Sequence, residues 1–268
     1  MSAMFGETSW ASILAAIATQ NVRIRKISRV TRLRYLKIIA LLGLCIFATT
    51  RSALSHELWL DSKSFQIKSD EILEIDLRNG ENFKGINLSF YTKSIKQFFW
   101  VQNERRANVI SRMGDMPAMR VTMEHDGLVS VVYESTPSFL TYTEWNKFVD
   151  FVTHKDLGDA LERHSANGWP KDRFKEVYHR YSKALIGVGM ADGKDQNFGL
   201  ATEFVALENP YLDETPDTFL VKLLYDNAPR IGAQVEVFER NDGKDVRVFT
   251  QRTDKNGQVS IPVKGGHD

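Results

Sequence analysis

The chain has 268 residues, of which 43% are apolar and 26% charged, a balance typical of one large or two modest folded domains. The net charge of +1 hides an asymmetry, because residues 1–55 carry eight basic side chains and one acidic one. The remaining 27 basic and 33 acidic side chains give the body a charge of about −6. A mildly acidic body without a clustered basic face argues against nucleic acid as the partner.

Residues 1–55 have the order of a secretory signal. Seven positive charges in residues 22–37 precede a 13-residue apolar run, Ile38–Thr50, and the small residues Ala53 and Ser55 then predict cleavage before His56. The run is shorter than the roughly 20 apolar residues that span a bilayer, so a cleaved signal is favoured over an anchor formed by residues 36–50. Positive residues ahead of the run predict export of the body, to the periplasm or another extracytoplasmic space.

The single cysteine, Cys45, lies in this leader. Leu44 precedes it where a lipoprotein signal needs a small residue, which disfavours lipid attachment. The processed protein would therefore contain no disulfide, zinc–thiolate site or cysteine nucleophile. The long stretch ahead of the basic residues is also compatible with a translation start at Val22.

Residues 56–143 predict short antiparallel strands. In EILEIDL, apolar Leu73, Ile75 and Leu77 alternate with acidic residues, which is the period of a half-buried strand. KQFFWVQ, NVISR, MRVTM and LVSVVYE follow, separated by turn-like NGENFKG, MGDMP and EHDG. We expect a β-sandwich domain over residues 56–212.

Residues 144–186 predict a helical hairpin inserted in this β domain. Apolar residues recur at helical spacing from Trp145 to Leu161 and again from Phe174 to Leu185, and Asn167–Pro170 separates the two runs.

Residues 217–268 predict a second, smaller β unit, after a returning strand in FGLATEFVALENPYL. TFLVKLLYD, AQVEVFER, KDVRVFTQR and GQVSIPV supply four strands in the rhythm of an immunoglobulin- or transthyretin-like sandwich. Because the chain stops at GGHD, where further strands would be expected, we interpret this unit as truncated. The fold class is thus mainly β, with two sandwich units and a helical hairpin between them.

HELWL after the cleavage site, RYSKALIGVG, EFVALENPYL, LLYDNAPRIGAQVEVF and TDKNGQVSIPV together resemble the DUF4198 family from His56 to the end of the chain. This family comprises bacterial periplasmic proteins related to the extracytoplasmic substrate-recognition components of nickel-uptake transporters. The resemblance implies two β-sandwich units and, by analogy, a role in metal handling, with a membrane transporter component as a partner.

His56 is the candidate metal ligand. After cleavage it would carry a free α-amine and an imidazole, which can close a chelate ring on nickel or copper, and both groups lose protons near neutral pH. We expect His125 in a turn, His154 and His164 on the first helix and His179 on the second, each at the surface or at a helix cap. His267 lies too near the end of the sequence to be assigned a role.

Motifs for catalysis are missing from the sequence: it contains no HExxH, CxxC, GxSxG, Walker loop or Rossmann glycine pattern after a strand. We therefore expect an exported, non-enzymatic protein that binds nickel or copper during uptake. The alternatives are an interaction or carbohydrate-binding β-sandwich module that uses no metal, and a hydrolase with an unrecognised site.

The leader predicts a defined mature terminus. N-terminal sequencing of the protein recovered from the outer compartment should give His-Glu-Leu-Trp-Leu. Membrane-retained protein that still carries residues 36–50 would contradict cleavage and remove the chelating amine.

Overall fold

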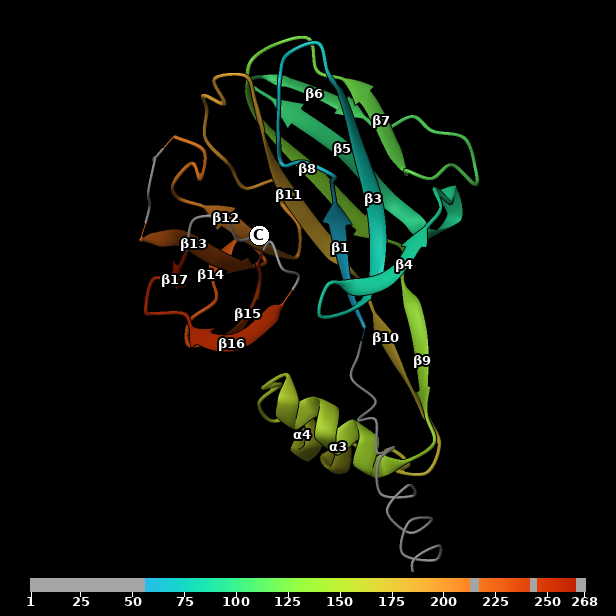
Figure 1. Ribbon diagram of the computed structural model, residues 1–268. Helices are drawn as coiled ribbons and strands as arrows, with labels where there is room; N and C mark the ends of the chain where they lie inside the picture. The colour runs from blue at the N-terminus through green and yellow to red at the C-terminus, as the bar shows by residue number, and fades with distance from the viewer. Residues whose placement is uncertain (1–55, 213–216, 242–244, 264–268) are drawn as a thin grey trace, which may run out of the picture. The chain divides into compact units, whose positions relative to one another are not determined.

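A computed structural model describes residues 56–212, 217–241 and 245–263 (Figure 1). The predicted signal and its cleavage site, Cys45, Val22 and His267 lie outside these ranges. The described residues are mainly in strands, with two α-helices, which confirms the predicted mainly-β fold.

Strand β3 (Ile72–Glu81) is the centre of the first sheet. β1 (Glu57–Asp61) pairs with it antiparallel, and β4 (Lys84–Leu88) and β7 (Met119–Thr122) pair with successive parts of it. Leu73, Ile75 and Leu77 are at most 2% exposed, so the alternation in the sequence correctly predicts the face that β3 buries.

A second sheet packs against the first. Its order is β2 (Gln66–Ile67), β11 (Tyr181–Val188), β8 (Gly127–Ser135), β5 (Ile95–Gln102) and β6 (Arg105–Asn108), and the short 3₁₀ helix η1 (Thr92–Ser94) precedes β5. Side chains of both sheets meet in one core, which includes Leu60, Ile75 and Leu77 from the first sheet and Phe98, Val131 and Ile186 from the second. This arrangement is the β-sandwich that the short strands predict.

The predicted second helix is wrong. Within residues 144–186, only Trp145–His154 (α3) and Ala160–Ala166 (α4) are helical, whereas Phe174–Tyr178 is strand β10 and Tyr181–Val188 is strand β11. Ala184, Ile186 and Val188 are buried at alternate positions of β11, so this segment also has the period of a strand. Pairing with β8 along the whole length of β11 decides between the two patterns.

The helical hairpin closes a long β ladder. β9 (Ser138–Tyr142) continues from β8 and pairs with β10, which leads into β11, so α3 and α4 connect the two strands at the end of this ribbon (Figure 1). Tyr142 and Phe174 are partners across the ribbon, and their rings stack with centroids 5.2 Å apart. Phe148 of α3 packs edge-on against both rings and thereby fixes the helices to the ribbon.

The second β unit has its own core. β13 (Thr218–Tyr225) pairs with β12 (Thr202–Ala206), β14 (Ala228–Pro229) and β17 (Gln258–Pro262), and β15 (Gln234–Arg240) pairs with β16 (Val246–Arg252). Val221, Leu223, Val235 and Val259 meet between the two small sheets. Because β12 pairs with β13, this unit draws its first strand from residues before the expected boundary at 212.

In the described part of the chain, no helix is long and apolar enough to cross a membrane.

Two isoleucines in the first sheet provide a matched test of this packing. Ile75→Ala should lower the free energy of unfolding by about 2–5 kcal/mol, because the side chain is fully buried in the core between the sheets. Ile86→Ala on β4, where the side chain is 65% exposed, should change it by less than about 1 kcal/mol. Urea unfolding of both variants measures the difference, and equal losses would contradict the assigned face of β3.

Candidate functional site

The register of β1 on β3 places His56 beside Glu81. Glu57 pairs with Gly80, so the next position outward sets His56 opposite Glu81. The two side chains approach one another, with 3.9 Å between Nε2 of His56 and Oε1 of Glu81. A one-residue slip would turn the two side chains to opposite faces of the sheet, so this contact depends on the register that the buried residues of β3 enforce.

The hairpin between β3 and β4 fixes Glu81. Gly80 and Gly85 pair so closely that a Cβ on Gly80 would lie 2.0 Å from the carbonyl oxygen of Lys84, which leaves room only for glycine. Asn82 and Phe83 form the turn with φ values of 51° and 58°. Positive φ is unfavourable for a bulky side chain such as phenylalanine, so packing of its ring must offset the backbone strain.

The Phe83 ring lies between the two β units. Its centroid is 6.3 Å from that of Trp59 on β1 and 6.4 Å from that of Phe238 on β15, both in edge-on geometry. The guanidinium of Arg240 lies 4.7 Å from the same ring. These contacts hold the Glu81 turn in place.

The backbone at His56 is held by Arg180, from the turn between β10 and β11. Its guanidinium donates a hydrogen bond to the carbonyl oxygen of His56, and its backbone N–H donates to Oγ of Ser135. The imidazole of His56 is 61% exposed. The site therefore combines a fixed backbone with an accessible nitrogen ligand.

Acidic residues next to His56 are already neutralised by a lysine. Nζ of Lys155, at the end of α3, lies 3.2 Å from Oε1 of Glu57 and 2.6 Å from Oε2 of Glu236 on β15. Burial lowers the pKa of Lys155, but the hydrogen bonds and charges of Glu236 and Glu57 outweigh burial and hold the pKa above its ordinary value. Lys155 therefore stays protonated at neutral pH and leaves Glu81 as the carboxylate free to act on His56.

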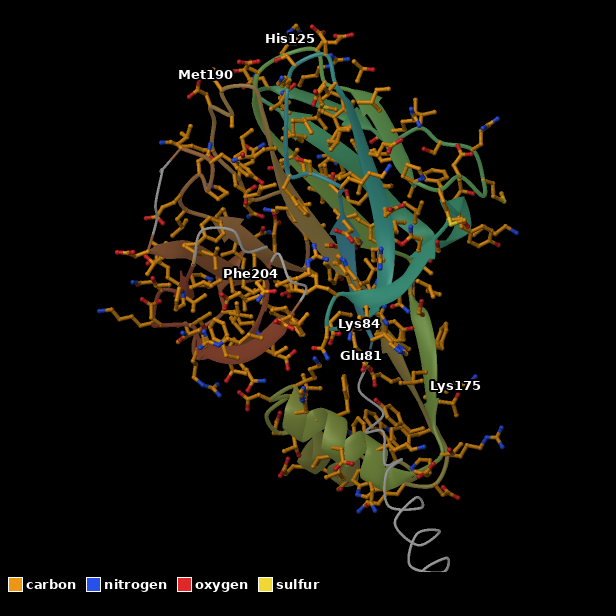
Figure 2. All side chains as sticks on the ribbon, in the orientation of Figure 1. Glu81, Lys84, His125, Lys175, Met190 and Phe204 are labelled. Carbon is orange, nitrogen blue, oxygen red and sulfur yellow. The ribbon has the colours of Figure 1, made fainter. Side chains whose placement is uncertain are left out.

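The remaining described histidines do not join this site. His125 is exposed in a turn, as predicted, at the end of the sandwich far from Glu81 (Figure 2). His154 is exposed at the end of α3, where its Nε2 lies 3.0 Å from Oε1 of Glu236. His179 is exposed in the turn between β10 and β11 rather than on a helix.

The surface or cap position predicted for His164 is wrong. It lies on α4, not on the same helix as His154, and is 3% exposed. Its ring packs among Trp145, Phe148, Trp169 and Phe174, and its Nε2 lies 3.0 Å from the carbonyl oxygen of Pro170. This histidine is part of the small core between the helices and the ribbon.

Within residues 56–212, 217–241 and 245–263, no group of three or more His, Cys, Asp or Glu side chains is placed to hold a metal ion.

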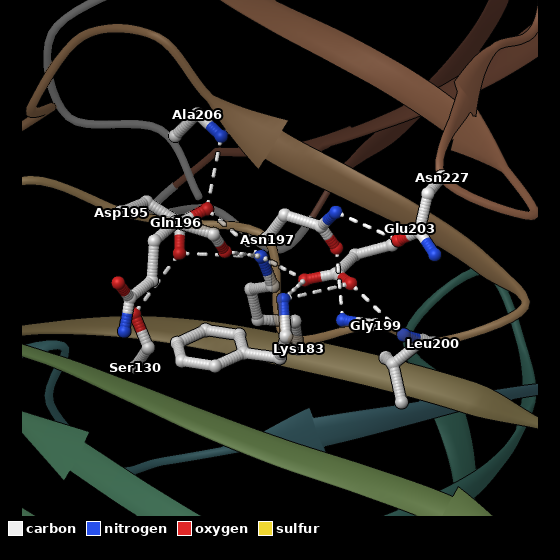
Figure 3. A network of polar contacts seen from close by, with 11 residues as sticks. Ser130, Lys183, Asp195, Gln196, Asn197, Gly199, Leu200, Glu203, Ala206 and Asn227 are labelled. Atoms are coloured by element: carbon white, nitrogen blue, oxygen red, sulfur yellow. Dashed lines mark hydrogen bonds and ion pairs between the residues drawn. The ribbon is translucent and has the colours of Figure 1, made fainter.

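A buried ionic network lies elsewhere, where β11 meets the segment that leads into β12 (Figure 3). Nζ of Lys183 lies 3.0 Å from Oδ2 of Asp195 and 2.7 Å from Oε1 of Glu203, and both carboxylates are 1% exposed. Lys183 also donates a hydrogen bond to the carbonyl oxygen of Gln196, 3.0 Å away. Its ammonium lies 4.9 Å from the centre of the Phe198 ring.

Every carboxylate oxygen in this network is satisfied. Asp195 accepts hydrogen bonds from Oγ of Ser130 and from the backbone N–H of Ala206. Glu203 accepts from the backbone N–H groups of Phe198 and Leu200. The network therefore fixes the conformation of residues 195–206 and leaves neither carboxylate free to bind a ligand.

The fold and these contacts define a β-sandwich protein with a helical insertion between strands β9 and β10. The family model of a domain of unknown function, DUF4198, matches residues 53–267, so the chain belongs to the DUF4198 family. No curated protein and no solved structure gives a significant match.

Removing the Lys183 ammonium should destabilise the protein strongly. Lys183→Met should lower the free energy of unfolding by about 3–5 kcal/mol, because it leaves two buried carboxylates without a counter-charge. Adding Glu203→Gln to this variant should recover part of the loss, because one negative charge is removed while the side-chain oxygen still accepts hydrogen bonds. Lys175→Met, at an exposed position on β10, is the control and should have little effect. Equal stability of the Lys183→Met variant and the wild type would contradict the role of the network.

Proposed function

We propose that the processed protein is a periplasmic, non-enzymatic binder of Ni²⁺ or Cu²⁺ that takes part in metal uptake or handling. The observation that carries the proposal is the position of His56, which is the residue that signal cleavage would make the terminus. It is exposed, its carbonyl oxygen is held by Arg180, and its imidazole faces one free carboxylate.

In this proposal, the α-amine that signal cleavage would expose on His56 is the second metal ligand beside the imidazole. An α-amine and Nδ1 of the same histidine close a six-membered ring on one ion, and nitrogen ligands suit copper and nickel. Both groups bind the ion only in their unprotonated forms, so metal binding releases protons.

Glu81 supports this arrangement from the other side of the ring. When Nδ1 binds the ion, Nε2 carries the proton, and it already lies 3.9 Å from Oε1 of Glu81. A carboxylate that accepts this proton in a hydrogen bond fixes the tautomer and makes the imidazole a better ligand. Its negative charge also offsets part of the charge of the ion.

Metal titration of three forms tests the proposal. Protein that begins at His56 should bind Ni²⁺ or Cu²⁺ tightly, whereas a form with one extra residue should bind at least about 100-fold more weakly, because its nearest nitrogen is an amide. His56→Ala should abolish the site, and Glu81→Gln should weaken it by about 10-fold or more. Affinity should fall as the pH is lowered, because protons then compete with the ion for both nitrogens.

His125→Ala is the matched control, because His125 is exposed in a turn at the end of the sandwich far from Glu81 (Figure 2). Calorimetry should give the same affinity for this variant as for the unmodified protein. Equal binding by the extended form would rule out the chelate. No binding by the form that begins at His56 would favour the interaction or carbohydrate-binding module instead.

A further inference from the structure

The loop between β6 and β7 exposes three large apolar side chains. Ile110, Met113 and Met116 are 91%, 63% and 60% exposed, and Ile110 is the most exposed large apolar side chain in the described part of the chain. Single exposed apolar residues are common on protein surfaces, but three on one short loop indicate an interaction surface.

The backbone of this loop is fixed. Val109 and Ala118, at its two ends, are buried in the core between the sheets. Phe90 accepts a hydrogen bond from the N–H of Gly114 and donates one to the carbonyl oxygen of Asp115, both at 2.9 Å. β6 is the edge of the second sheet and β7 pairs with the first, so the loop crosses between the sheets at the edge of the sandwich (Figure 1). A backbone fixed before a partner arrives loses little entropy on binding.

The same stretch is basic, although the body of the protein is acidic. Residues 105–120 contain one acidic side chain, Asp115, and four arginines: Arg105, Arg106, Arg112 and Arg120. Their net charge of +3 contrasts with about −6 for the body as a whole. The loop therefore combines exposed apolar side chains with a local excess of positive charge.

The arginines on the flanking strands have acidic neighbours. Arg105 lies 3.6 Å from Glu124, and Arg120 lies 2.7 Å from Glu74. Both arginines are 61% exposed, so water screens these two pairs and leaves the guanidinium groups accessible.

The two middle arginines are available to an anionic partner. The side chain of Arg112 is 92% exposed, and its Nε lies 3.5 Å from Oδ1 of Asp115. Arg106 is exposed and packs over the Phe99 ring, and among the described residues its side chain has no carboxylate partner. Guanidinium groups match the geometry of phosphate oxygens and can bind them through paired hydrogen bonds.

We propose that this loop binds the surface of an anionic lipid bilayer. Ile110, Met113 and Met116 would enter the boundary between headgroups and acyl chains, and the arginines would contact lipid phosphates. A fluid lipid surface accepts an outward loop without a matching shape, whereas a protein partner would need a groove for it. This surface is separate from His56 and does not depend on metal binding.

Co-sedimentation with lipid vesicles tests the proposal. Protein that begins at His56 should bind vesicles of phosphatidylcholine and phosphatidylglycerol in equal parts at least about 10-fold more tightly than vesicles of phosphatidylcholine alone, because each arginine near an anionic surface contributes about fivefold. Added salt should weaken the binding, because it screens the charges. Equal binding to both kinds of vesicle, or no binding to the mixed ones, would overturn the proposal.

Variants locate the binding surface. Ile110→Ser combined with Met113→Ser should weaken binding at least about 10-fold, because two apolar side chains no longer enter the lipid, and Arg112→Gln should weaken it about fivefold. Ile231→Ser combined with Met190→Ser is the matched control, since these side chains are 65% and 70% exposed in turns outside this loop. The control should bind like the unmodified protein, and an equal loss in the two double variants would contradict the assigned surface.

A fluorescent label separates a membrane from a second copy of the chain as the partner. Protein that begins at His56 contains no cysteine, so Ile110→Cys and Ile231→Cys each provide one site for a polarity-sensitive fluorophore. With mixed vesicles, the emission of the label at residue 110 should shift to the blue, and that of the label at residue 231 should not change. A blue shift at residue 110 that grows with protein concentration in the absence of vesicles would assign the loop to self-association and overturn the proposal.

Discussion

One ammonium group between two buried carboxylates constrains much of this protein. Asp195 and Glu203 could not remain charged in the interior at acceptable cost if Lys183 did not lie between them. Because Lys183 belongs to β11 and Glu203 to β12, the interaction joins the first sandwich to the first strand of the second unit. The segment between these strands contains no regular structure, and its conformation depends on hydrogen bonds to the two carboxylates.

This segment also covers the second face of the five-stranded sheet. Leu200 and Phe198 pack on Phe99, Val101 and Val132, which point away from the main core. The sheet is therefore buried on both faces over part of its width, which explains why every residue of β8 is buried. The polar network and this apolar cover depend on one another, because the same short loop supplies both.

Local patterns predicted most of the strands but not how they are paired. The alternation from Leu73 to Leu77 identified the central strand and its buried face. The segment from Phe174 to Leu185 has apolar residues at helical spacing and at strand spacing, and only its pairing with β9 and β8 selects the strands. No local feature of the sequence distinguishes the buried His164 from a histidine on the surface of the same helix.

Of the residues in the candidate site, only His56 could be predicted from the sequence. The cleavage pattern singles out this residue, but its neighbours Glu81 and Arg180 come from positions 25 and 124 residues later in the chain. Their approach depends on the register of β1 on β3 and on the turn after β10, which single-sequence patterns do not encode. The Lys183 network was missed for the same reason, although a lysine in a strand that continues as Ala-Leu-Ile-Gly-Val indicates a charge that needs a partner.

Phe83 shows why the two β units are not interchangeable modules. Its backbone conformation suits glycine, yet its side chain fills the space between Trp59 and Phe238. The strain arises within the first unit, and part of the contact that offsets it comes from the second. If either unit were transferred alone into another protein, the backbone strain at Phe83 would be separated from the ring packing that offsets it. We therefore expect the two units to fold together and to be inherited as a pair.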